Sequence, residues 1–198
     1  MVDERRHQRS ARRWDGTAWR NAAIGAAGGA MGALAMNLYA RAIRSMNHGR
    51  EAAGAAPGSD RNGRGMQPPQ ADHRADQDAA VRVGKTAYRA ASGHNPSRAA
   101  EPWLGSLAHY GFGTATGICY AVAASRAPAL RTGFGTAYGS LVWVVADEGI
   151  MPALGLSRGP RELPLGVHAY ALCGHWVYGA TLEAVRRIGQ RSLARRLM

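Results

Sequence analysis

An apolar, glycine-punctuated segment at residues 130–156 constrains this chain more than any other feature. It is long enough to cross a bilayer, because about 20 mostly apolar residues in a helix span the hydrocarbon core. Its second half nevertheless contains two adjacent acids, Asp147 and Glu148. An acidic side chain inside such a segment costs roughly 2.5 to 3.5 kcal/mol on insertion scales. The two acids therefore need polar partners on other helices.

Three further apolar blocks could supply those partners. Polar residues crowd between the blocks, so the blocks themselves are nearly free of charge. This pattern predicts an all-α polytopic membrane bundle with about four transmembrane helices. Within a membrane domain of residues 21–187, the expected spans are 21–43, 104–125, 132–155 and 165–186. A soluble helical protein with an unusually small-residue core is the alternative, since the blocks are rich in Ala and Gly.

The formal net charge of +12 comes almost entirely from arginine. Such a charge suits nucleic acid or an anionic membrane surface. The arginines flank apolar blocks and do not form one basic face, so we expect a bilayer with anionic headgroups as the partner and no nucleic acid. Residues 1–20 form a basic N-terminal segment and residues 188–198 a basic tail. Four spans place both ends on one side, which the positive-inside rule makes the cytoplasm, although Arg41 and Arg44 follow the first span directly.

The region between the first and second spans divides into two parts. Residues 45–75 are rich in Gly, Pro, Arg, Asn and Gln and predict a flexible loop. Residues 76–92 predict a helix with Asp76 as N-cap and Gly93 as the stop signal. We expect this helix to lie along the membrane surface or to pack on the ends of the bundle.

Small residues recur every four positions within the apolar blocks. Such rows let helix backbones approach closely in a membrane, and no GxGxxG motif supports a nucleotide loop instead. Asn37 continues the first row and is placed to hydrogen-bond across helices. The predicted helix-packing residues are Gly25, Gly29, Ala33, Gly113, Gly117 and Gly179.

Ionisable side chains inside the blocks form a candidate polar cluster. Asp147 follows Thr136 and Ser140 on one helical face, which favours it as the acid that points into the bundle. Glu148 lies about 100° further round the helix and is expected to matter less. Counting depth along the helices brings the three histidines and Asp147 into one half of the membrane. The candidate cluster is His109, Asp147, Glu148, His168, His175 and Asn37.

Several roles are open to this cluster. It could be a hydrogen-bonded pair that only fixes helix register, or histidines with a reference pKa of about 6.5 could sense or relay protons. His109, His168, His175 and Asp147 have the ligand types of a zinc or other transition-metal site, but no HExxH motif supports one. A non-catalytic partner subunit, a homo-oligomer or a lipid-binding protein is a further class. The residues indicate no catalytic group and no cofactor, so an enzyme is not favoured.

Three stretches resemble the YagU-like family of small bacterial inner-membrane proteins. They are AHYGFGTATGICYA at 108–121, ADEGIMPALGLSRGPRELP at 146–164 and HAYALCGHWVYGATLEAVRR at 168–187. The resemblance covers residues 76–187 and implies a multipass inner-membrane fold. It implies no reaction and no catalytic residue.

Overall fold

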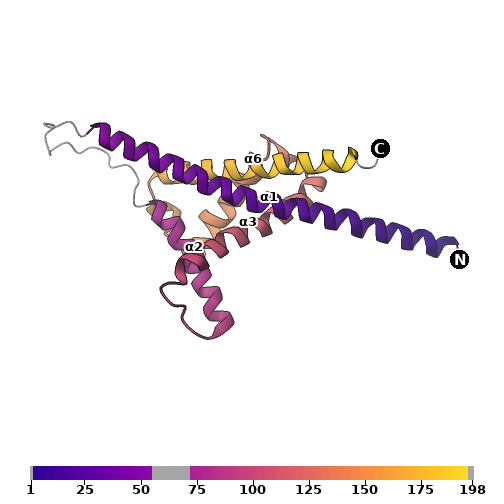
Figure 1. Ribbon diagram of the computed structural model, residues 1–198, viewed down its shortest axis with the longest axis horizontal. Helices are drawn as coiled ribbons and strands as arrows, with labels where there is room; N and C mark the ends of the chain where they lie inside the picture. Colours follow the sequence, from indigo (N-terminus) through magenta and orange to yellow (C-terminus); the bar gives the residue numbers. More distant parts are fainter. Residues whose placement is uncertain (1, 55–71, 196–198) are drawn as a thin grey trace.

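The computed structural model describes residues 2–54 and 72–195, with side chains described at 18–47, 79–192 and 195. This part of the chain consists of helices joined by short loops and contains no strand (Figure 1). The prediction of an all-α protein is therefore confirmed. The long helices are α1 (Val2–Gly54), α2 (Asp72–Ser92), α3 (Glu101–Arg126) and α6 (Leu165–Arg195).

The apolar segment at 130–156 is divided into several shorter elements. Three consecutive elements form one continuous helix. A short 3-10 turn lies before this helix, and a second 3-10 turn lies between it and α6. These elements are η1 (Pro128–Arg131), α4 (Thr136–Val142), η2 (Trp143–Ile150), α5 (Met151–Ala153) and η3 (Pro160–Glu162).

The helix of this segment begins four residues later than the expected boundary at 132. Gly133, Phe134 and Gly135 all have left-handed backbones, with φ of 60°, 58° and 90°. A right-handed helix cannot contain such residues, so it starts at Thr136. Phe134 is the unusual member, because a bulky side chain rarely adopts positive φ.

The middle element, η2, is a π-helix of eight residues. Pro152 is the second residue after its end and provides a physical reason. A proline ring in a helix clashes with the carbonyl four residues earlier and removes one backbone donor. The wider π spacing just before the proline relieves that clash. Asp147 and Glu148 both lie in η2, so their directions follow π geometry.

Two predicted boundaries change in the structure. Helix α1 runs well beyond the expected span 21–43, and residues 45–54 are helical where a loop was expected. No proline interrupts the chain before Pro57, and the intervening residues tolerate a helix. Helix α2 begins at Asp72 rather than at the predicted cap Asp76. The rest of the predicted loop, 55–71, lies outside the described residues.

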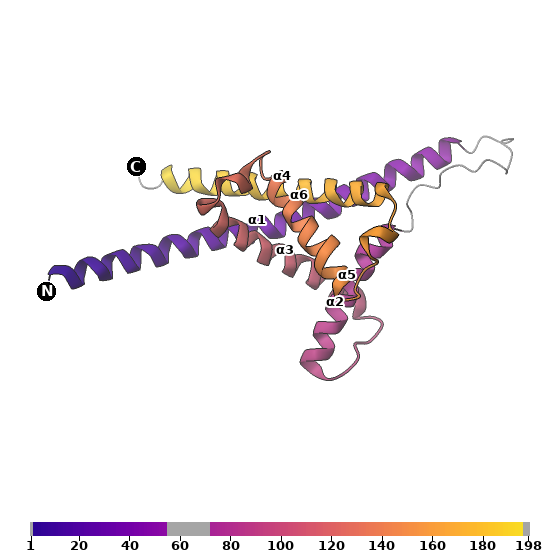
Figure 2. The same cartoon turned by 180° about the vertical axis from the view of Figure 1, so that it is seen from behind.

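Helix α1 packs against both α3 and α6, and the ribbons of these three helices lie together in both views (Figures 1 and 2). On α1, Gly25 and Gly29 meet the backbone of α3 at Gly117 and Gly113, where a Cβ on Gly25 would lie 2.5 Å from the Gly117 oxygen. The other side of α1 meets α6, where the Leu182 side chain lies against Gly28 and the Tyr178 ring lies against Gly32. These contacts make α1 antiparallel to both α3 and α6.

Helix α4 completes the bundle and is antiparallel to α6. Gly135 and Gly139 lie against the backbone of Gly179 and His175, too close for a larger side chain. The four apolar blocks therefore run alternately in opposite directions. Helix α2 lies outside this bundle and packs on the beginning of α3, where Gly84 meets Leu104.

Tyrosines form the core between α3, α4 and α6. Tyr120, Tyr138 and Tyr178 are all nearly inaccessible to solvent. Each hydroxyl has an acceptor: Tyr138 donates to the Thr116 carbonyl at 2.6 Å, and Tyr178 to the Gly113 carbonyl at 2.6 Å. These bonds allow a polar group to be buried without loss.

Large apolar side chains lie mostly on the outside of the described bundle. Exposed examples occur on each long helix of the bundle and on the α4–η2 segment, and they include Leu34, Leu107, Phe112, Leu141, Val145, Leu165 and Trp176. Within the described residues, one stretch, Ala18–Asn47 of α1, is long and apolar enough to cross a membrane by length and composition. This stretch gives weak support for membrane association.

Candidate functional site

The strongest polar contact among the candidate residues joins η2 to the beginning of α6. Nδ1 of His168 lies 2.6 Å from Oε1 of Glu148, and both side chains are mostly buried. The other ring nitrogen of His168, Nε2, lies 3.0 Å from the carbonyl oxygen of Pro160. The Trp143 ring meets the His168 ring edge-on at 6.3 Å. His168, on α6, is therefore in contact with both the π-helix η2 and the loop at Pro160.

This geometry fixes how many protons the pair holds. A carbonyl oxygen only accepts hydrogen bonds, so Nε2 of His168 must carry a proton. The 2.6 Å contact with Glu148 needs a second proton, either on Nδ1 or on the carboxyl group. In both cases Glu148 and His168 share one proton and are neutral as a unit. When that proton leaves, one of the two hydrogen bonds of the ring is lost.

A second acid and histidine lie beside this pair. Asp147 Oδ2 is 3.7 Å from Nδ1 of His175, which is within ion-pair range but too long for a hydrogen bond. The same Nδ1 lies 3.0 Å from the carbonyl of Ala171, four residues earlier on α6. The His175 side chain is about 10% exposed and that of Asp147 33%. Asp147 is therefore the looser of the two acids.

The contacts in the structure reverse the expected order of the two acids, in which Asp147 pointed into the bundle and Glu148 mattered less. The expected order assumed α-helical spacing of about 100° per residue. In the π-helix η2, each residue bonds five positions along, so consecutive side chains are separated by a smaller angle. Both acids consequently face α6, and Glu148 makes the closer contact.

His109 and Asn37 stabilise a different contact, between α1 and α3. Nε2 of His109 lies 3.3 Å from the Ala33 carbonyl, and the Asn37 amide donates to the Tyr110 hydroxyl at 3.1 Å. His109 is also within electrostatic range of His175. The structure therefore divides the predicted cluster into two acid–histidine pairs and one α1–α3 contact. Among the described residues, no three His, Cys, Asp or Glu side chains gather closely enough to hold a metal ion.

A second polar site lies near the opposite end of α6 and centres on Glu183. This carboxylate is fully buried, with an exposed fraction of 0%. It accepts hydrogen bonds from the Tyr120 hydroxyl at 2.6 Å, from Arg186 at 2.6 and 2.8 Å, and from Arg187 at 2.7 Å. The two arginines follow Glu183 at i+3 and i+4, the spacing at which oppositely charged side chains pair on one helix, so the sequence alone indicates both pairs. It did not predict Tyr120, because no local pattern shows which tyrosine of α3 faces α6.

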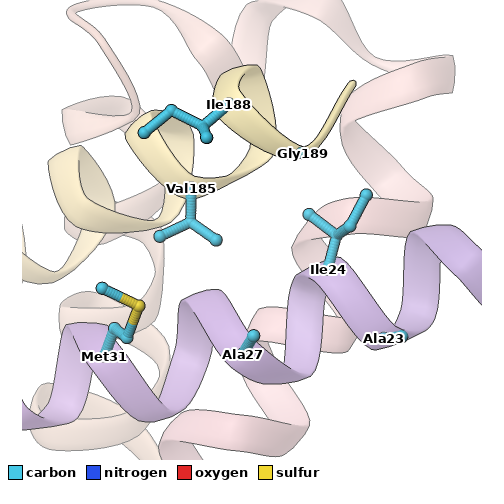
Figure 3. A pocket seen from close by; sticks show the side chains of 7 residues that line it. All are labelled: Ala23, Ile24, Ala27, Met31, Val185, Ile188 and Gly189. Carbon is cyan, nitrogen blue, oxygen red and sulfur yellow. The ribbon is translucent and has the colours of Figure 1, made fainter. Parts of the chain in front are cut away.

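A groove of about 430 Å³ lies between α1 and α6 on the outside of the bundle (Figure 3). Its lining is apolar, from Ile24, Ala27 and Met31 on α1 and from Val185 and Ile188 on α6. Such a lining offers no hydrogen-bond donor or acceptor and no group for acid–base chemistry. The groove therefore provides shape for an apolar occupant and no reactive site.

The fold and these contacts define a small all-helical protein whose antiparallel helices pack through glycines and are joined by acid–histidine and acid–arginine pairs. A family model described as a protein of unknown function, DUF1440, matches residues 65–184, and the chain belongs to this family. No curated protein and no solved structure matches the chain.

Proposed function

We propose that this chain is an integral protein of the bacterial inner membrane, as its resemblance to the YagU-like family suggests, in which four helical segments cross the bilayer. The crossing segments are α1, α3, α4–η2–α5 and α6. The distribution of side chains supports this: glycines face other helices while large apolar residues such as Leu34 and Leu107 face outward. Helices packed in lipid have this distribution, because close backbone contact replaces the hydrophobic effect between them.

The direction of the helices supports the same placement. Alternating directions bring both ends of the bundle segment to one side, consistent with cytoplasmic termini. Trp19, at the start of this part of α1, is 74% exposed, and Trp103, at the start of the antiparallel α3, is 78% exposed. They lie at opposite ends of the bundle, where tryptophans are enriched at the two membrane interfaces.

We further propose that the protein responds to protons through the pair of Glu148 and His168. The observation that carries this proposal is the position of His168 between two acceptors, the Glu148 carboxylate and the Pro160 carbonyl. Losing the shared proton leaves the charged acid bonded to Nδ1–H and leaves Nε2 bare. The lone pair of the bare Nε2 then faces the lone pairs of the Pro160 carbonyl oxygen, and the two atoms repel each other. The loop before α6 is released, while Asp147, His175 and His109 supply the other titratable groups nearby.

The test measures whether this loop opens as protons leave. In a variant with Cys119 and Cys173 replaced by Ala, Ser157→Cys reports on the loop and Ser97→Cys serves as a reference in another loop. A membrane-impermeant maleimide labels both, and the rate at 157 is divided by the rate at 97. We expect this ratio to rise with increasing pH, because the shared proton then leaves the pair and the loop loses its hydrogen bond to the ring.

Glu148→Gln is the variant that decides the result. It removes the acid that shares the proton, so the ratio should become independent of pH. Asp147→Asn is the matched control and should keep the pH dependence. An unchanged pH profile in Glu148→Gln, or a flat profile in the unmodified pair, would contradict the proposal. Membrane placement is tested separately: the protein should stay in the membrane pellet through an alkaline carbonate wash, and release would overturn the four-span arrangement.

A second candidate is a non-catalytic subunit of a membrane complex or of a homo-oligomer. The apolar groove between α1 and α6, continued by the exposed side chain of Met31, favours it, because such a surface offers packing and no chemistry. Cross-linking through Met31→Cys in membranes distinguishes a homo-oligomer from a complex with another protein. Dimers would support the homo-oligomer, and a cross-link to another protein would support the complex.

A further inference from the structure

An open hollow of about 550 Å³ lies where the C-terminal half of α6 meets the loop between α3 and α4. Four arginines line it, together with a single acid, Glu183, and the side chain of Thr132. The arginines are Arg131, Arg186, Arg187 and Arg191. Four positive charges therefore face one negative charge. The hollow is distinct from the acid–histidine pairs, which lie near the other end of α6.

The single acid is already fully used. Both oxygens of Glu183 accept two hydrogen bonds each, from Tyr120, Arg186 and Arg187. Arg186 also donates its remaining terminal amino group to Gln190 at 2.6 Å. Glu183 therefore acts as an anchor that fixes Arg186 and Arg187 in place. It has no lone pair left for another arginine.

Three arginines keep donors that the described part of the chain does not satisfy. Arg187 contacts Glu183 through Nε alone, and its guanidinium carbon lies 4.7 Å from the centre of the Phe134 ring. Its terminal amino groups therefore have no hydrogen-bond partner among the described residues. Among the described residues, neither the Arg131 nor the Arg191 side chain has a hydrogen-bond or ion-pair partner. Guanidinium groups brought together in this way repel one another, and a shared anion removes the repulsion.

The loop that carries Arg131 and Thr132 is held tightly against α6. Its left-handed turn at Gly133 to Gly135 is followed by direct backbone contact with Gly179, and Phe134 adopts φ of 58°. Strained backbones of this kind persist where the surrounding structure fixes them, often at ligand clamps. The turn therefore positions Arg131 opposite the arginines of α6.

We propose that this hollow binds the phosphate group of an anionic phospholipid, a proposal that rests on the membrane placement above. Arginine forks match phosphate oxygens in paired hydrogen bonds, which makes phosphate the fitting anion. The source is a lipid because exposed apolar side chains lie next to the arginines: Phe134, beneath Arg187, is 45% exposed, and Ile188, which follows Arg187 on α6 and lines the neighbouring apolar groove, is 64% exposed. A soluble phosphate would leave these side chains in water, whereas lipid chains cover them.

The experiment uses the full chain purified in a neutral detergent and titrated with phosphatidylglycerol, with phosphatidylcholine as the zwitterionic reference. Native mass spectrometry counts the bound lipids. Arg131→Gln/Arg191→Gln removes two open arginines and leaves Glu183 and its partners intact. Arg158→Gln/Arg161→Gln is the matched control, since it removes two exposed arginines from the loop at the other end of α6. We expect the first pair to weaken phosphatidylglycerol binding at least about tenfold and the second pair hardly at all.

Each outcome decides the proposal. Equal losses in both variants would mean that net charge alone attracts the lipid, and no loss would mean that the hollow is not the site; either overturns it. Inorganic phosphate that displaces phosphatidylglycerol at equal concentration would show that the lipid chains add nothing to binding, and it would overturn the lipid source. Failure of the membrane proposal is separate, because the carbonate wash detects it in the unmodified protein whatever the lipid titration shows.

Discussion

Glu183 depends on its hydrogen-bond partners more than any other acid of the described bundle, because a buried carboxylate is stable only when hydrogen bonds replace its hydration. Tyr120 from α3 supplies one of these bonds, and Arg186 and Arg187 from its own helix supply the rest. The hydrogen bond from Tyr120 is the one of these that joins two helices, α3 and α6. The anchor therefore joins α3 to α6 and at the same time holds the arginines of the hollow.

The first prediction compares two ways of weakening this anchor. Glu183→Gln leaves Arg186 and Arg187 without their counter-charge and should lower the free energy of unfolding by about 3–5 kcal/mol, as for a broken buried pair. Tyr120→Phe removes one bond to a charged acceptor and should cost about 1.5–3 kcal/mol. Chemical unfolding in detergent measures both. Glu162→Gln, on an exposed turn, is the control, and equal stabilities of all three variants would contradict the anchor role.

The second prediction concerns the order of the two acids in η2. Glu148→Ala leaves the His168 ring without its 2.6 Å partner and should lower the free energy of unfolding by about 1–3 kcal/mol. Asp147→Ala should cost less, because its contact with His175 is 3.7 Å and its side chain is one-third exposed. Thermal unfolding in detergent at one pH compares them. A greater loss for Asp147→Ala would restore the order that the helical wheel suggested.

At the residue scale, the sequence could identify the ionisable side chains but could not pair them. Acids and histidines inside apolar blocks are visible because each is costly there. Which acid meets which histidine depended on the π-helix, which the α-helical period of 3.6 residues does not anticipate. The second partner of the His168 ring is the backbone carbonyl of Pro160, and a pattern of side chains cannot predict a hydrogen bond to the backbone.

Helix contacts give the third prediction, which uses two glycines of α3. A Cβ on Gly117 would lie 2.7 Å from the Gly29 Cα of α1, so Gly117→Ala must separate the helices and should destabilise by about 1–3 kcal/mol. Gly111 has nothing within 4 Å of the same added atom. Gly111→Ala should therefore stabilise by up to about 1 kcal/mol through helix propensity alone. Thermal unfolding of the two variants measures this contrast, and changes of the same sign would show that the α1–α3 contact is not as close as described.

At the scale of elements, the spacing of small residues indicated which helix faces pack together. The polar composition of the segments between apolar blocks was a poorer guide to where the helices end. A four-residue period of small residues is a local property, so Gly25 and Gly29 could be assigned to a packing face from the chain alone. The start of α4 could not, because Phe134 carries no sequence signal for positive φ. Likewise α1 continues past residue 43, since polar composition alone does not stop a helix that lacks proline.

The whole molecule shows why hydropathy alone is a weak guide to this chain. Only the stretch Ala18–Asn47 of the described part passes the length and composition test for a span. The other crossing segments proposed here contain histidines, tyrosines and threonines whose polar groups bond inside the bundle, such as Thr116 with Tyr178 at 2.7 Å. Their mean hydropathy is lowered by groups that never need to face lipid. The alternating directions of the helices, which hydropathy cannot reveal, are what the four-span proposal needs.

The last prediction tests those directions in intact cells. The antiparallel arrangement puts the end of α6 at the end of the bundle opposite to the loop between α2 and α3. With both native cysteines replaced by Ala, Ser192→Cys and Ser97→Cys place single thiols at these two ends, and both side chains are exposed. The arginines around the C-terminal end of α6 should hold it in the cytoplasm. A membrane-impermeant maleimide added outside sealed spheroplasts should therefore label position 97 at once and position 192 only after lysis. If both positions were labelled from the same side, the protein could not cross the bilayer along its antiparallel helices. Labelling of 192 alone would keep the four spans and reverse their orientation, and the arginine hollow would then face the outer leaflet.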